Sequence, residues 1–230
     1  MKFLILALSL FSASIATLAA EPIKSERSLR ADAHRKMRME YAASAEYNPY
    51  ASGLLEIRKA SSKYLESGDF EKALGEAEKG LALDRLNIDL LMTAAAAARN
   101  KGNTTMADEL RQRWMALIDS IVDRSLGDGR SYAKAFKVIS VDEEYATLSV
   151  FKLECTKQIV VENSGSEYDI LTVKGKDSDG EFELYFNVDI PKKWLARHLF
   201  GKEEQNPPTE SAEEKHPPAS QAQAPAVPHS

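Results

Sequence analysis

The chain has 230 residues, a formal net charge of −5 at pH 7 and a hydrophobic content of 43%. An acidic chain without a basic stripe interleaved with aromatic residues lacks the footprint of phosphate-backbone binding, so we expect no nucleic acid among its partners. The apolar content suffices for two modest cores, which predicts one repeat unit and one small domain after the first twenty residues.

Residues 1–20 have the layout of a secretory signal peptide. Lys2 precedes an apolar run over residues 3–10, and small residues then lead to Ala19 and Ala20. We expect cleavage after Ala19 or Ala20 and a secreted protein, with the periplasm as the expected compartment and extracellular release left open. No later segment reaches the roughly 18 apolar residues that a membrane-spanning helix needs, so we expect no transmembrane segment.

Residues 21–46 form a charged N-terminal arm. The arm has six lysines or arginines against five aspartates or glutamates. Such mixed charge is typical of a solvated surface. We therefore expect the arm to be a solvated helix or a partly disordered segment.

Residues 47–126 contain an internal repeat with a period of 34 residues. Shifting the chain by that length superimposes similar residues, among them Leu54 on Ile88, Gly68 on Gly102 and Ala73 on Ala107. This period, with small residues and a glycine at fixed phase, is typical of stacked helix-turn-helix units. The sequence therefore predicts two helical hairpins, each turning at its glycine and restarting at Asp69 or Asn103, which are good N-cap residues.

The first unit contains the run Gly68-Asp69-Phe70-Glu71-Lys72-Ala73-Leu74, followed by Ala77, Leu81, Leu83 and Asp84. This pattern resembles a tetratricopeptide repeat, and a second, more divergent copy brings the similar region to about residues 53–122. The resemblance implies a TPR-like scaffold that binds a protein or a peptide. An ordinary bundle of four amphipathic helices is the alternative.

The resemblance also implies where a partner would bind. The first helix of each hairpin should line a concave face, with candidate partner contacts at Leu55, Arg58, Ser62, Met92, Ala96 and Arg99. Members of the repeat family that bind chaperone tails use a set of Lys, Arg and Asn residues that this chain does not reproduce. Recognition of a C-terminal carboxylate is therefore not implied.

The last helix of the repeat region carries an apolar stripe that is wider than one neighbouring helix requires. The stripe includes Trp114, Ile118 and Ile121. Repeat arrays usually need about three units to bury their core, and this chain has two. We therefore expect the following domain, or a second copy of the chain, to pack against the stripe. An exposed Trp114 that binds a ligand is the alternative.

Residues 127–200 are predicted to form a small antiparallel α+β domain. Strands are expected over residues 135–140, 158–162, 168–174 and 181–189. Ser140 and Glu143 have the spacing of a capping box, which predicts a helix between the first two strands. One face of the last strand carries Phe182, Leu184, Phe186 and Val188. That face should be covered by the capped helix and by a closing helix that begins near Pro191.

A second resemblance extends over the repeat and the small domain. The residues that carry it include Tyr47-Asn48-Pro49-Tyr50, Glu144-Tyr145 and Tyr185-Phe186-Asn187-Val188-Asp189-Ile190-Pro191 with Trp194. Over about residues 46–196 the chain is similar to an uncharacterised family of exported bacterial proteins, domain of unknown function 4919. The resemblance implies export and supplies no activity.

No catalytic constellation stands out in the sequence. His198 is the one histidine in a segment predicted to fold, and the chain has no Gly-x-Ser-x-Gly or His-Glu-x-x-His motif. We expect no cofactor and no metal, and the leading hypothesis is a non-catalytic interaction protein of unknown partner. The rival hypotheses are a hydrolase-like or ligand-binding activity around Asn187, Asp189 and His198, and a structural dimer or assembly factor. The oligomeric state stays open.

Residues 201–230 are predicted to be a disordered tail. From Lys202 onward the segment holds six of the nine prolines, and five glutamates against two lysines. Such a composition cannot bury enough apolar surface to offset the entropy of ordering the chain.

Overall fold

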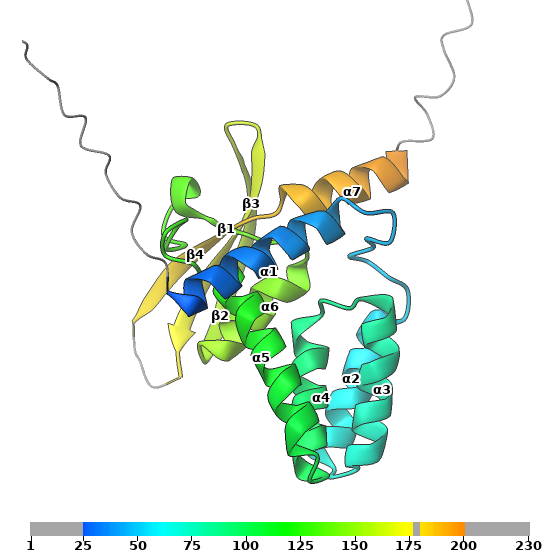
Figure 1. Cartoon of the computed structure of the whole chain (residues 1–230). Coiled ribbons are helices and arrows are strands. Elements are labelled where there is room, and N and C mark those ends of the chain that lie inside the picture. The colour runs from blue at the N-terminus through cyan, green and yellow to red at the C-terminus, as the bar shows by residue number, and fades with distance from the viewer. Residues whose placement is uncertain (1–24, 177–179, 201–230) are drawn as a thin grey trace, which may run out of the picture.

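The computed structural model describes residues 25–176 and 180–200 (Figure 1). Its elements are α1 (Glu26–Ala42), α2 (Leu54–Glu66), α3 (Phe70–Leu83), α4 (Ile88–Asn100), α5 (Thr104–Ile121), η1 (Tyr132–Lys134), β1 (Phe136–Lys137), α6 (Val141–Val150), β2 (Leu153–Asn163), β3 (Ser166–Gly175), β4 (Glu181–Asn187) and α7 (Asp189–Phe200). The predicted signal peptide and the predicted tail lie outside the described residues. Within the described part, no helix is both long and apolar enough to cross a bilayer.

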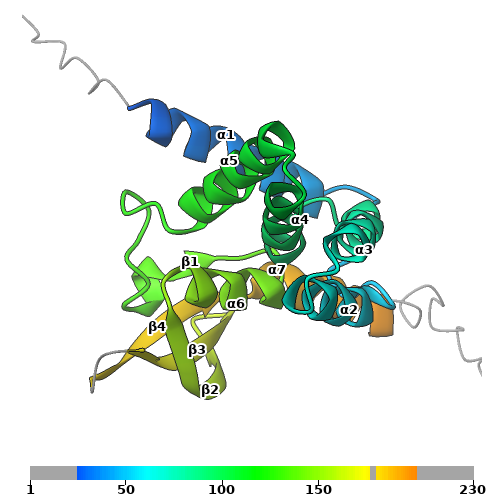
Figure 2. The ribbon, with the colours of Figure 1, turned by 90° about the horizontal axis from the view of Figure 1, so that it is seen from below.

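Helices α2 to α5 form the two predicted helical hairpins, which are stacked side by side (Figure 2). The helices α4 and α5 begin 34 residues after α2 and α3. Gly68 and Gly102 turn the chain with φ angles of +78° and +82°, a conformation that glycine adopts without steric cost. The side chains of Asp69 and Asn103 each accept a backbone hydrogen bond in the first helical turn, as expected of N-caps.

The charged N-terminal arm forms a helix, which is one of the two alternatives expected, and one side of this helix is packed against the rest of the structure. Helix α1 lies beside α5 (Figure 2) and buries Ala31, Arg38 and Tyr41. The mixed charge concealed this contact, because the arginines of α1 form ion pairs with acidic residues of other elements. Arg27, for example, donates from Nε to Asp119 of α5 over 2.8 Å.

The apolar stripe of α5 is covered by the chain itself. Ile118 and Ile121 are buried, and the half-buried Trp114 packs against the same cluster. This cluster extends from Tyr41 of α1 to Phe186 of β4, so one hydrophobic core joins the hairpins to the sheet. The following domain thus packs on the stripe, as predicted. Helix α1, which precedes the stripe in the chain, covers it as well.

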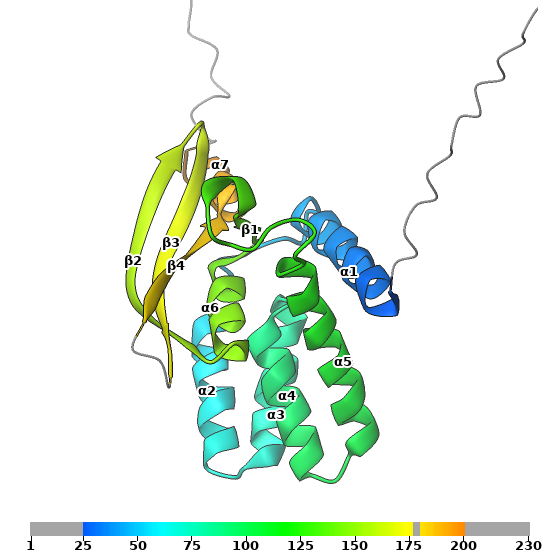
Figure 3. The same cartoon turned by 90° about the vertical axis from the view of Figure 1, so that its left-hand side faces the viewer.

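A four-stranded mixed sheet forms the second half of the structure, in the order β1-β4-β3-β2. Its three long strands pair antiparallel, as predicted, whereas the two-residue β1 pairs with β4 in parallel. Leu184, Phe186 and Val188 are buried on the face predicted to need a cover. Behind this face lie α6 and the helical stack, and α7 follows β4 (Figure 3).

Helix α6 connects the hairpins, α1 and the sheet through three consecutive acidic residues in its first turn. Asp142 accepts a hydrogen bond from Arg58 of α2, and Glu143 forms an ion pair with Arg38 of α1. Glu144 instead faces the sheet, where Asp169 of β3 interacts with it electrostatically. Successive helical residues point about 100° apart, so the three acidic side chains of this one turn contact three different parts of the structure.

Candidate functional site

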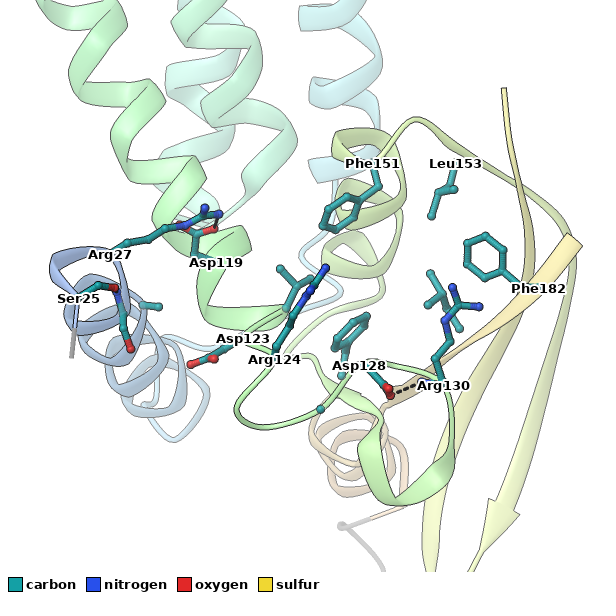
Figure 4. A pocket seen from close by; sticks show the side chains of 16 residues that line it. Ser25, Arg27, Asp119, Asp123, Arg124, Asp128, Arg130, Phe151, Leu153 and Phe182 are labelled. Atoms are coloured by element: carbon teal, nitrogen blue, oxygen red, sulfur yellow. Dashed lines mark hydrogen bonds and ion pairs between the residues drawn. The ribbon is translucent and has the colours of Figure 1, made fainter. Parts of the chain in front are cut away.

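A large open cleft lies where the end of α5, the start of α1 and the sheet region meet (Figure 4). It has a volume of about 1080 Å³, slightly above the range usual for small-molecule sites. Its lining comes from α1, the end of α5, the loop that follows α5, and the strands: Ser25, Arg27, Ser28, Ala31, Asp119, Val122, Asp123, Arg124, Gly127, Asp128, Arg130, Phe136, Phe151, Leu153, Phe182 and Leu184.

One wall of the cleft is apolar. Phe151 follows the last turn of α6 and is 50% exposed, and Leu153 begins β2 two residues later. Phe182 of β4 completes this side of the cleft (Figure 4). An exposed aromatic ring beside further apolar side chains is a common feature of interaction sites. The wall therefore offers contact area to a ligand with an apolar group.

The loop after α5 carries two arginines into the cleft. Figure 4 shows the side chains of Arg124 and Arg130 extending toward the side on which Phe151 and Phe182 lie. The guanidinium carbon of Arg130 is 3.8 Å from the centre of the Phe182 ring, which is a cation–π contact. Gly129 has a φ angle of +70°, and a Cβ there would lie 2.5 Å from the Phe136 ring, so this loop packs directly on the floor of the cleft.

Two of the three acidic residues that line the cleft are neutralised by α1, whereas Arg124 and Arg130 have no acidic partner among the described residues. Asp119 pairs with Arg27, and Asp123 pairs with Arg35 over 2.7 Å. Hydrogen bonds from Ser125 and the nearby guanidinium of Arg35 lower the pKa of Asp123. Among the described residues, neither Arg124 nor Arg130 has a carboxylate partner. The cleft thus presents two guanidinium groups with unused hydrogen-bond donors.

The residues predicted to line the concave groove differ in their contacts and exposure. Arg58 donates hydrogen bonds to Asp89 of α4 and to Asp142, so the chain's own α6 occupies this end of the concave face. Arg99 pairs with Asp108, and Ser62 donates to Glu66. The remaining three residues differ in exposure: Leu55 is exposed, Ala96 is half-buried, and Met92 packs against the main core.

The residues named for a rival catalytic role have local structural contacts. The His198 ring stacks on Trp194 at 3.6 Å and its Nδ1 lies 2.8 Å from the Trp194 carbonyl oxygen. Asp189 accepts hydrogen bonds from the Ser166 hydroxyl and the Glu167 backbone N–H. Neither side chain lines the cleft. Across residues 25–176 and 180–200, no group of three or more His, Cys, Asp or Glu residues is placed to hold a metal ion.

A buried pair of carboxyl groups, Glu144 and Asp169, was missed by sequence reasoning. Their relative exposures are 0% and 4%. Both carboxyl oxygens of Glu144 and Oδ1 of Asp169 are buried without a hydrogen-bond donor among the described residues. Burial, reinforced by the charge of Asp169, raises the pKa of Glu144 to about 9. Glu144 is therefore protonated at neutral pH and can share its proton with Asp169.

A signal for this pair was present in the strand alternation. Asp169 occupies the same face of β3 as Leu171 and Val173, which are fully buried. A charged residue in a core-facing register indicates a buried polar partner. The partner, Glu144, lies on a separate element and could not be identified from spacing alone.

The comparisons with known proteins give one match. Residues 22–197 match the family described as a domain of unknown function, DUF4919. No curated protein and no solved structure matches the chain. The match covers α1 to α7 apart from the last helical turn, including every residue that lines the cleft. The chain therefore belongs to the DUF4919 family.

Proposed function

We propose that this chain is an exported, non-catalytic binding protein that holds a segment of a partner protein in the cleft between α1, the end of α5 and the sheet. The observation that carries the proposal is the cleft itself, which combines an exposed apolar wall with two arginines that lack acidic partners within residues 25–176 and 180–200. Large, partly apolar clefts with a few convergent polar groups are the usual form of a binding site.

The two hairpins serve in this proposal as a rigid, TPR-like scaffold. Their concave face is less suited to a partner than the sequence indicated, because Arg58 is already paired with Asp89 and Asp142. The same pairing holds α6 against the hairpins, and Phe151 at the end of α6 supplies the apolar wall. The scaffold thus positions the cleft.

Export is the second part of the proposal, and it is supported by the layout of residues 1–20. N-terminal sequencing of the protein recovered from the periplasm or the medium tests it. We expect the mature chain to begin at Ala20 or Glu21. A protein that keeps Met1 and stays in the cytoplasm would contradict export without affecting the cleft.

Site-specific photocrosslinking in the native cell tests the binding site. A photoreactive benzoyl-phenylalanine is placed at Phe151 in the cleft or, as the matched control, at Leu55 on the hairpins. The two positions are comparable because Phe151 is 50% exposed and Leu55 is 56% exposed. We expect adducts with another protein from position 151 and not from position 55. Adducts from position 55 alone, adducts only with a second copy of the chain, or no adduct would each contradict the proposed site.

A further inference from the structure

We infer that the cleft selects a partner segment in which carboxylates stand next to a large apolar side chain. The inference rests on the proposed function, and it adds the chemistry of the partner. Two features of the cleft carry it: the arrangement of its charges and the position of the arginines against its aromatic wall.

The charges around the cleft favour an acidic ligand. Asp119 and Asp123 would repel it if they were free, but Arg27 and Arg35 of α1 neutralise them. Asp128 accepts a hydrogen bond from the backbone N–H of Arg130, which fixes the turn of the loop. Together with Arg35, the cleft holds four arginines against three aspartates, a formal charge of +1. Arg124 and Arg130 carry this excess, because they have no acidic partner among the described residues.

The contact between Arg130 and Phe182 orients one of these arginines in advance. The cation–π contact, at 3.8 Å, holds the guanidinium over the Phe182 ring. The ring provides no oxygen or nitrogen acceptor, so the contact does not use the N–H donors of Arg130. The N–H groups of Arg130 are then free to bind a carboxylate in a bidentate manner. The entropy lost on binding is smaller because the side chain is already held.

The apolar wall sets the second half of the specificity. Phe151, Leu153 and Phe182 lie on the side of the cleft toward which Arg124 and Arg130 extend (Figure 4). A ligand that binds both groups must carry its negative charge beside an aromatic or aliphatic side chain. The cleft is open and about 1080 Å³ in volume, which suits a run of several residues better than a single small anion.

Fluorescence anisotropy with synthetic peptides tests the inference on the full mature chain. The probe is a fluorescein-labelled peptide of sequence Gly-Asp-Phe-Glu-Leu-Gly with blocked ends. One comparison peptide replaces its acids by Asn and Gln, and another replaces Phe and Leu by Ala. We expect each comparison peptide to bind at least tenfold more weakly, because charge-assisted bonds and apolar burial each contribute that much. Added salt should weaken only the acidic peptides.

Two variants assign the effect to the arginines. Arg124→Gln with Arg130→Gln should lower the affinity for the acidic peptide to that for its amide version. Arg111→Gln removes an exposed arginine outside the cleft and should leave the affinity unchanged. All three substitutions are at exposed positions, so matching thermal melting curves would verify that the fold is intact.

The possible outcomes separate this inference from the proposed function. If position 151 crosslinks to a partner but the acidic and amide peptides bind equally, the acidic selectivity is wrong and the binding site stands. If no peptide binds up to millimolar concentration, or if a dansyl-labelled fatty acid binds to the cleft and displaces the peptide, the inferred partner class is wrong. If position 151 yields no adduct, the proposed function itself fails.

Discussion

Glu143 and Glu144 are neighbours on α6, and they face two regions of the molecule that treat a buried carboxyl group in opposite ways. Glu143 faces the helical side, where Arg38 donates from Nε to its Oε1 over 2.7 Å and the Ile139 backbone N–H donates to its Oε2. Glu144 faces the sheet, where it interacts with another acid, Asp169. One carboxylate is compensated, and the other is kept neutral by retaining a proton.

The difference shows that the buried carboxyl groups of α6 are compensated to different degrees on the helical side and on the sheet side. On the helical side each buried charge has an opposite charge and several hydrogen bonds, which is the condition under which a buried ion pair is tolerated. On the sheet side α6 packs Ala146 and Leu148 into the shared core, but its buried carboxyl group there faces a second acid instead of a cation. Since Phe151 directly follows α6 and lines the cleft, a shift of α6 would move the apolar wall of the proposed binding site.

Removal of Arg38 should have the largest effect on stability of the substitutions that test this difference. In Arg38→Met, Glu143 stays buried without its cation, and we expect the free energy of unfolding to fall by about 3–5 kcal/mol. Urea denaturation at pH 7 measures this loss. The double variant Arg38→Met with Glu143→Leu should recover much of it, because no uncompensated charge is then buried. A loss below about 1 kcal/mol in the single variant would show that this ion pair does not secure α1.

Replacement of Glu144 by a neutral residue should instead raise the free energy of unfolding. The Glu144→Gln variant replaces a carboxyl group that must take up a proton on folding, and its amide can donate to Asp169 Oδ1, for which the described part of the chain supplies no donor. We expect this variant to be more stable than the wild type at pH 8, by a margin of about 1–3 kcal/mol. Glu143→Gln is the matched control, and it should be destabilising because it weakens the pair with Arg38.

The pH dependence sharpens this contrast. The pKa of Glu144 is raised to about 9 in the folded protein, from an ordinary value of 4.5. Between these two pH values the folded state binds a proton that the unfolded state lacks, so stability falls as the pH rises. The advantage of Glu144→Gln should therefore grow by up to about 1.4 kcal/mol per pH unit across this window and level off outside it. Parallel stability curves for the two proteins would contradict the raised pKa.

A comparison of the expected and observed elements shows which parts of this structure a single sequence can predict. Helices α2 to α5 followed from local signals, because the 34-residue period, the turn glycines and the N-caps all lie within the segment that they organise. The cover by α1 did not, since Arg38 and its partner Glu143 are 105 positions apart. The cleft is likewise assembled from distant segments, and only its arginine–aromatic chemistry, not its location, could have been noticed beforehand.

A smaller test on the helical side concerns the hydroxyl group of Tyr47. This buried group donates a hydrogen bond to the Ile139 carbonyl, next to the backbone N–H that binds Glu143. The Tyr47→Phe variant leaves a buried carbonyl without its partner, and we expect a loss of about 1–2 kcal/mol in the free energy of unfolding. Thermal and urea denaturation should agree on the loss. A neutral effect would mean that the network around Glu143 does not depend on this bond.

The corresponding hydroxyl on the sheet side belongs to Tyr145, and its removal should have the smallest effect. Its Oη donates to Gln158 Oε1, and the Gln158 amide in turn donates to Asp169. Tyr145 is 41% exposed, so water can replace its hydroxyl at the Gln158 oxygen, and we expect Tyr145→Phe to cost less than about 0.5 kcal/mol. A loss as large as that of Tyr47→Phe would show that the exposed link orients Gln158.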